Sequence, residues 1–66
     1  MSQTRRTFIQ NLLPGDLFFF DGHSHDTCEV VSRVNQANLT RIVYTTGGIE
    51  SEYTRVCLTT VNKIEG

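Results

Sequence analysis

The residue types best suited to chemistry lie close together in one short segment of the chain. His23 and His25 are separated by one residue, so in an extended backbone both imidazoles point to the same side. Asp21, Asp26 and Cys28 flank them, and zinc or nickel accepts imidazole, carboxylate and thiolate ligands. The same composition is also typical of a solvated polar loop. No distant third ligand accompanies the two histidines, so we favour the loop and expect no metal or other cofactor.

The two cysteines raise the possibility of nucleophilic catalysis. Cys28 lies three residues after His25, and Cys57 lies two residues after Arg55. A reactive thiolate needs a base within hydrogen-bond distance, an orienting group and a pocket, and a domain of this size is not expected to provide a pocket. Cys28 shares a strand face with Val30, which favours a buried and inert thiol. We therefore predict that the protein is not an enzyme.

Carboxylates and arginines give two further patterns. Glu50 and Glu52 share one face of an expected strand, where they are typical of an edge strand that charge keeps soluble. Arg33, Arg41 and Arg55 occupy expected outward positions on neighbouring strands and could follow a phosphate backbone. The formal net charge is −1, with seven acidic and six basic residues, and no RNA-binding motif is recognisable. Nucleic-acid binding is therefore the alternative function and not the favoured one.

The composition predicts an all-β protein. The chain has a single alanine and nine threonines, and it is rich in valine, isoleucine and aromatic residues. Turn signals recur about every ten residues, among them Pro14-Gly15 and the hairpin signal Gly47-Gly48. The strands expected between them are 17–20, 27–34, 39–46, 49–56 and 61–64. The segment 7–13 fits either a helical turn or a short strand, and we expect an extended or single-turn lead-in that places Phe8 and Leu12 beneath the sheet.

Strand alternation divides the apolar residues into a core and an outward set. The expected core residues are Phe8, Leu12, Phe18, Phe20, Val30, Val34, Ile42, Tyr44, Val56, Leu58, Val61 and Ile64. The expected outward apolar residues are Leu17, Phe19, Val31 and Val43. A contiguous outward patch usually marks an interface. The alternative is that the N-terminal segment covers it through Phe8 and Ile9, and periodicity does not separate the two.

The length of 66 residues predicts one domain, spanning residues 1–66, with marginal stability of its own. No apolar leader segment precedes the polar N-terminus and no apolar run could cross a bilayer, so we expect a cytoplasmic protein with reduced cysteines. Without a disulfide or metal, self-association is the expected source of added stability. We predict a homo-oligomer, most simply a two-fold dimer centred on Phe19, that has no contact with a membrane and can also bind another protein.

The opening of the chain resembles a known class of domain. The stretch from Leu12 to Phe18, with Gly15-Asp16 leading into an apolar strand, is similar to the opening of small SH3-like barrels of bacterial and phage proteins. The resemblance implies a five-stranded antiparallel barrel over most of the chain. Sm-like barrels are a poorer match, because Pro14-Gly15 interrupts the position of their N-terminal helix. SH3-like barrels host unrelated activities, so the resemblance implies a fold and not a function. The expected function is a non-catalytic protein-interaction or assembly module.

Overall fold

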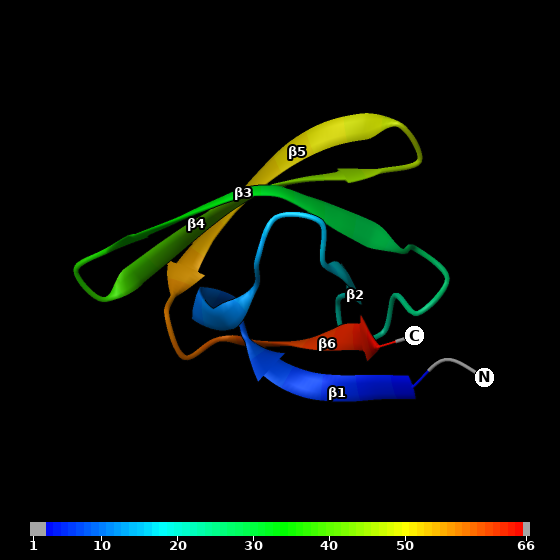
Figure 1. Ribbon diagram of the computed structural model, residues 1–66, viewed down its shortest axis with the longest axis horizontal. Helices are drawn as coiled ribbons and strands as arrows, with labels where there is room; N and C mark the ends of the chain where they lie inside the picture. The colour runs from blue at the N-terminus through cyan, green and yellow to red at the C-terminus, as the bar shows by residue number, and fades with distance from the viewer. Residues whose placement is uncertain (1–2, 66) are drawn as a thin grey trace.

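β-Branched and aromatic residues recur along most of the chain, and the segments that carry them form strands. A computed structural model describes residues 3–65, and the two ends of the predicted domain, residues 1–2 and 66, lie outside this range. The described residues form six strands and one 3₁₀ helix (Figure 1). In chain order these are β1 (Gln3–Phe8), η1 (Ile9–Asn11), β2 (Leu17–Phe19), β3 (Cys28–Gln36), β4 (Leu39–Thr46), β5 (Ile49–Val56) and β6 (Thr60–Glu65). None of the elements within residues 3–65 is a helix with the length and apolar character needed to cross a membrane.

The strands form one antiparallel sheet in the order β1-β6-β2-β3-β4-β5. The sheet bends strongly, so that β3, β4 and β5 lie over β6, β1 and β2, with η1 between the two halves (Figure 1). The predictions of an all-β class and of antiparallel strands are confirmed. The sheet has six strands where five were expected, because residues 3–8 pair with β6 along their whole length, from Gln3 opposite Glu65 to Phe8 opposite Thr60.

The β4–β5 hairpin follows the turn chemistry of its sequence. Gly47 and Gly48 have φ values of 58° and 81°. A two-residue turn with positive φ at both positions matches the right-handed twist of the strands that it joins. Glycine adopts this conformation without the steric penalty of a Cβ atom. The turn sets the register of the hairpin, which begins with Thr46 opposite Ile49.

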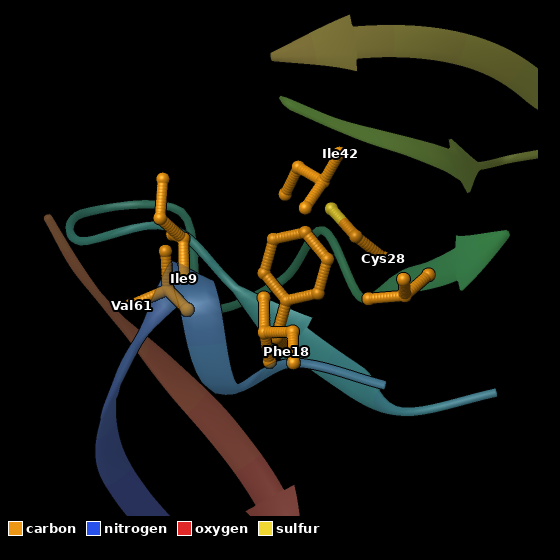
Figure 2. Packing of buried hydrophobic residues seen from close by; sticks show 7 residues of the cluster. Ile9, Phe18, Cys28, Ile42 and Val61 are labelled. Carbon is orange, nitrogen blue, oxygen red and sulfur yellow. The ribbon is translucent and has the colours of Figure 1, made fainter. Parts of the chain in front are cut away.

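The core lies between the two halves of the bent sheet. Its buried apolar residues are Ile9, Leu12, Phe18, Cys28, Val30, Ile42 and Val61 (Figure 2). Phe18 occupies the centre, and its ring makes edge-on contacts with the half-buried rings of Phe20 and Tyr44 at centroid distances of 5.2 and 5.7 Å. Tyr53 also packs against this cluster from β5. We refer to the face of the sheet that carries Phe18, Val30 and Ile42 as the inner face, and to the opposite one as the outer face.

The 3₁₀ helix places Ile9 in the core in the position expected for Phe8. Residues three apart eclipse each other in a 3₁₀ turn, so Ile9 and Leu12 point to the same side, and both are fully buried. Phe8 precedes the turn at the end of β1 and is 40% exposed. The prediction for Leu12 is therefore confirmed. The prediction for Phe8 is wrong, because a one-residue shift in where the strand ends reverses the side to which a side chain points.

A β-bulge in β3 reverses the expected faces of the second half of that strand. Val30 lies opposite Tyr44, whereas the next pair is Ser32 opposite Val43, so Val31 is an extra residue. Beyond the bulge, Arg33 lies opposite the buried Ile42 on the inner face. Val34, expected in the core, is 48% exposed on the outer face.

Three other predicted core residues also lie elsewhere. Val56 pairs with Leu39 on the outer face and is 51% exposed, and Leu58 is exposed in the turn between β5 and β6. Ile64 is half-buried on the outer face opposite Leu17. The strands are long relative to the small core, so their distal ends project beyond it and side chains there stay in solvent. The predictions for the remaining members are confirmed, with Phe20 and Tyr44 at the half-buried margin.

Replacing Ile9 should destabilise the domain far more than replacing Phe8. We expect Ile9→Ala to lower the free energy of unfolding by about 2–5 kcal/mol and the milder Ile9→Val by about 0.5–1.5 kcal/mol, because each leaves a cavity beside Phe18. Phe8→Ala should cost less than Ile9→Ala, since the Phe8 ring is already largely in solvent. Urea unfolding of the three variants measures the difference, and an equal or larger loss for Phe8→Ala would contradict the assigned core.

Candidate interaction surface

Five apolar side chains lie along the outer face of β3, β4 and β5. We refer to Val31, Val34, Leu39, Val43 and Val56 as the outer stripe. Leu39 and Val56 are direct cross-strand partners, and Val43 lies opposite the bulge that contains Val31. Val34 and Leu39 line a shallow hollow of about 500 Å³ together with Arg41. Four of the five are exposed, and Val43 is half-buried. The five side chains thus share one face of three neighbouring strands, which alternation leaves facing water, and Arg41 lies among them opposite Val34.

The structure divides the four residues that were expected to form one interface. Val31 and Val43 belong to the outer stripe, whereas Leu17 and Phe19 lie on β2. Leu17 is exposed and lies between Ile64 and the carboxylate-bearing Glu29 in its cross-strand row. Phe19 is half-buried. All four lie on the outer face, as alternation predicts, but β2 lies in the other half of the bent sheet.

The N-terminal segment leaves the outer stripe uncovered. Ile9 is buried in the core, and β1 pairs edge-on with β6 and so continues the sheet instead of crossing its outer face. The alternative that Phe8 and Ile9 cover the outward apolar residues is therefore wrong for the outer stripe. Within residues 3–65, the exposed stripe residues retain between 45% and 51% of their accessible surface.

A polar network flanks Phe19 on the outer face of β1 and β6. The Arg6 guanidinium donates two hydrogen bonds to the Asp21 carboxylate, at 2.6 and 2.9 Å, and the Asn62 amide donates a third at 2.7 Å. The hydrogen bonds from Arg6 are the larger cause, and the one from Asn62 the smaller, that hold the pKa of the Asp21 carboxyl below its usual range. Asn62 lies opposite Phe19 in the β2–β6 pairing. The network ties the loop after β2 to the N-terminal strand and makes the surroundings of Phe19 polar.

The histidine loop is a pair of hydrogen-bonded turns at the surface. The backbone N–H of His23 donates to the Phe20 carbonyl, and that of Asp26 donates to the His23 carbonyl, both at 3.0 Å. His23 and His25 are exposed, and the His23 imidazole is 3.9 Å from the Asp26 carboxylate. Among the described residues, no three histidine, cysteine, aspartate or glutamate side chains converge as a metal site would require. The loop borders a hollow of about 700 Å³ beside Phe20 and Tyr44.

The two cysteines are free thiols in different surroundings. Cys28 is buried in the core, and burial raises the pKa of its thiol. Cys57 is half-buried, and its Sγ is 3.1 Å from the Thr40 hydroxyl. That hydroxyl is itself buried and donates to the Asn35 side chain at 2.6 Å. The buried surroundings of Cys28 disfavour a thiolate nucleophile.

The three arginines expected to face outward do not share a surface. Arg33 lies on the inner face as a consequence of the bulge, where its guanidinium donates to the Gln10 carbonyl at 2.6 Å. Arg41 lies on the outer face, 3.9 Å from the Glu52 carboxylate. Arg55 lies opposite the buried Thr40 and is therefore on the inner face, where it stacks on the ring of Tyr53 at 4.7 Å. The expectation that Arg55 faces outward is wrong, because the register of the hairpin gives it the same parity as Tyr53. The expectation for Arg33 is wrong because it assumed uninterrupted alternation along β3.

Comparison of the chain with models of protein families, with curated proteins and with solved structures finds no match. The surface is therefore interpreted from its own geometry. Sequence reasoning missed three members of the outer stripe. Leu39 shares the parity of Val43 along one strand, so alternation could have identified it, and its partner Val56 follows from the hairpin register. Val34 could not be assigned without the bulge, for which the sequence gives no glycine signal.

Zinc should leave the thermal stability of a metal-free preparation unchanged, since the two exposed histidines have no third ligand. The measurement is a thermal melt with and without one equivalent of zinc, with the double variant His23→Ala, His25→Ala as the control. A clear rise in Tm for the natural sequence that the double variant lacks would reveal a metal site, because a ligand that binds the folded state raises its apparent stability.

Cys28 should react with a thiol reagent slowly in the folded protein and completely after denaturation. Its raised pKa moves thiolate formation to higher pH, and the core shields the sulfur. The variants Cys28→Ser and Cys57→Ser separate the two rates, and half-buried Cys57 is expected to be the faster. Rapid labelling of Cys28 at neutral pH would show an accessible, activated thiolate instead.

Proposed function

We propose that this protein is a non-catalytic interaction or assembly module that associates with copies of itself, built on a small SH3-like barrel. Strands β2 to β6 lie in the order 6-2-3-4-5, so the last strand returns to pair with the first of this set. A strongly bent antiparallel sheet with a returning strand supports the barrel assignment. In this interpretation β1 is an added edge strand, and its pairing with β6 is an elaboration of the five-stranded unit.

The observation that carries the proposal is the uncovered outer stripe. Burying a valine or leucine side chain fully contributes about 1.5–3 kcal/mol, and the exposed stripe residues realise only part of this in a single chain. A small domain is stable by only about 5–15 kcal/mol. Burying several such side chains in an interface would therefore contribute a free energy that is large compared with the stability of the domain. A group of exposed apolar side chains on one face of a sheet supports a protein interface.

A second copy of the chain is the simplest partner that could cover the outer stripe. A two-fold axis through the outer stripe brings the same apolar residues against one another. Arg41 lies among the stripe residues, opposite Val34, and its ion pair with Glu52 of the neighbouring strand supplies opposite charges that a second copy can meet. The net charge of −1 also leaves little long-range repulsion between copies.

Nucleic-acid binding, the alternative function, receives less support. A phosphate backbone needs several cations along one surface. Arg33 is committed to the Gln10 carbonyl, Arg41 is near Glu52, and Arg55 is stacked on an aromatic ring. Arg41 lies on the outer face, whereas Arg33 and Arg55 lie on the inner face. RNA binding that falls steeply with added salt would favour the alternative.

The variant Val34→Asp should yield a smaller species than the natural sequence by light scattering. It places a charge within the outer stripe at a position already 48% exposed, so the circular dichroism spectrum should keep its strand signal. Leu13→Asp is the matched control, because Leu13 is similarly exposed, at 54%, but lies in the turn before β2. A natural protein that is already monomeric at high concentration would contradict the proposal.

A further inference from the structure

We propose that copies of this chain associate head to tail, with the free edge of β5 in one copy pairing with the free edge of β1 in the next. The inference rests on the proposed function and adds a second, head-to-tail contact to the contact between outer stripes. It differs from a two-fold contact between outer stripes, because two unlike surfaces meet. Three features of the sheet carry it: the state of its two edges, the directions of the edge strands, and their charges.

Both edges of the sheet are available for pairing. The strand order places β1 at one edge and β5 at the other, and within residues 3–65 each pairs with a neighbour on one side alone. The edges have six and eight residues, respectively. Neither contains proline, the residue that would remove a backbone donor. An edge of this kind presents a row of backbone N–H and C=O groups that another strand can pair with.

The directions of the two edge strands suit a head-to-tail contact. Each of the five strand pairings in the sheet is antiparallel, so β5 runs antiparallel to β1 across the sheet. A second copy that continues the sheet beyond β5 therefore places its β1 antiparallel to β5 of the first copy. The outer faces of both copies then stay on one side, which continues the antiparallel pattern without interruption.

The charges of the two edges are complementary. Strand β1 carries Arg5 and Arg6 and no acidic residue, whereas β5 carries Glu50 and Glu52 and a single basic residue, Arg55, near its end. Glu50 lies opposite Thr45 and Glu52 opposite Val43, which places both carboxylates on the outer face. Arg6 lies opposite Asn62, which lies opposite Phe19, so Arg6 is on the outer face too. A same-face register can therefore place Arg6 directly opposite Glu52 or Glu50.

Arg6 is positioned to accept a second carboxylate. Its bond to Asp21 fixes the guanidinium on the outer face of β1, and its side chain still has 56% of its surface exposed. In the register that opposes Arg6 to Glu52, Arg5 lies opposite Tyr53 on the inner face. Arg55 already stacks on this ring within the chain, so the favourable contact of this register is the one between Arg6 and Glu52.

Pairing of like edges is disfavoured by the same charges. For two copies of β1 related by a two-fold axis, the registers with the fullest overlap oppose Arg5 to Arg5 or Arg6 to Arg6. For two copies of β5, these registers oppose Glu52 to Glu52 or place the two Glu52 side chains on adjacent diagonal positions. Like charges directly opposite one another destabilise a strand pair. The unlike edges are thus the favoured combination.

The test uses charge reversal at one edge with a matched control elsewhere. The edge variant is Glu50→Lys with Glu52→Lys, and the control is Asp26→Lys with Glu29→Lys, which makes the same change in net charge at exposed positions away from both edges. Glu29 is especially well matched, because it lies in the same cross-strand row as Glu50, with Thr45 between them. Light scattering and sedimentation measure the mass of each variant at several concentrations and salt concentrations.

We expect the edge variant to lose the species formed through β5, while the control keeps the mass distribution of the natural sequence. The edge variant retains an intact β1, so a small amount of it should shorten the oligomers of the natural protein by capping them. Mixing it with the double variant Arg5→Glu, Arg6→Glu should restore one contact, in which the lysines introduced on β5 meet the acids introduced on β1.

Two results would overturn the inference, and they differ in what they leave standing. An edge variant that keeps the full mass of the natural protein, while Val34→Asp reduces that mass, would show assembly through the outer stripe alone, so the head-to-tail geometry would fail and the proposed function would hold. A natural protein that is monomeric at high concentration would remove both. Equal loss of mass in the edge variant and in the control would show a general charge effect and would also refute pairing of the edges.

Discussion

The extra residue at Val31 is the constraint on which the surface of this protein depends. Two residues of β3 lie opposite one residue of β4, and every side chain beyond that point in β3 changes face. Arg33 turns inward as a result, and Val34 turns outward into the outer stripe. Strand β3 pairs with β2 before the bulge and with β4 on both sides of it, so it joins the two halves of the sheet. One inserted residue therefore decides which arginine is structural and which valine is exposed.

The inward arginine connects the bulge to the N-terminal segment. Its guanidinium donates to the backbone carbonyl of Gln10, which lies in the 3₁₀ helix that carries Ile9 into the core. The same helix is linked to the turn that follows β5, because the Ile9 N–H donates to the Thr59 carbonyl at 2.8 Å. Three separate parts of the chain thus meet at one short element. The described part of the chain has a small core of seven buried apolar side chains. We therefore expect the hydrogen bonds at this helix to be important for the geometry of the core.

The sequence allows the class of the fold and most of the core centre to be predicted, because these depend on local patterns. The Gly47-Gly48 turn, the long strands on either side of it, and the burial of Phe18, Val30 and Ile42 follow from turn chemistry and alternation. Val34 and Arg33 could not be placed, since a bulge without a glycine leaves no mark on the periodicity. Phe8 and Ile9 are adjacent and equally apolar, so the position at which β1 gives way to the 3₁₀ helix decides which is buried.

The candidate surface was partly predictable for the same reason: Val31 and Val43 follow from alternation, but the separation of Leu17 and Phe19 from them depends on the bend of the sheet.

The pairing of β1 with β6 brings the two ends of the described chain together. Gln3 lies directly opposite Glu65, and Figure 1 shows the two ends side by side. These contacts join residues that are about as far apart in sequence as the chain permits, so closing them costs loop entropy that the β3–β4–β5 meander does not incur. The meander is therefore expected to form first and the β1–β6 pair late.

Adjacent ends also make the fold suited to circular permutation: a short linker can join residues 3 and 65, and new ends can open at Gly47-Gly48, where no side chain would be disturbed.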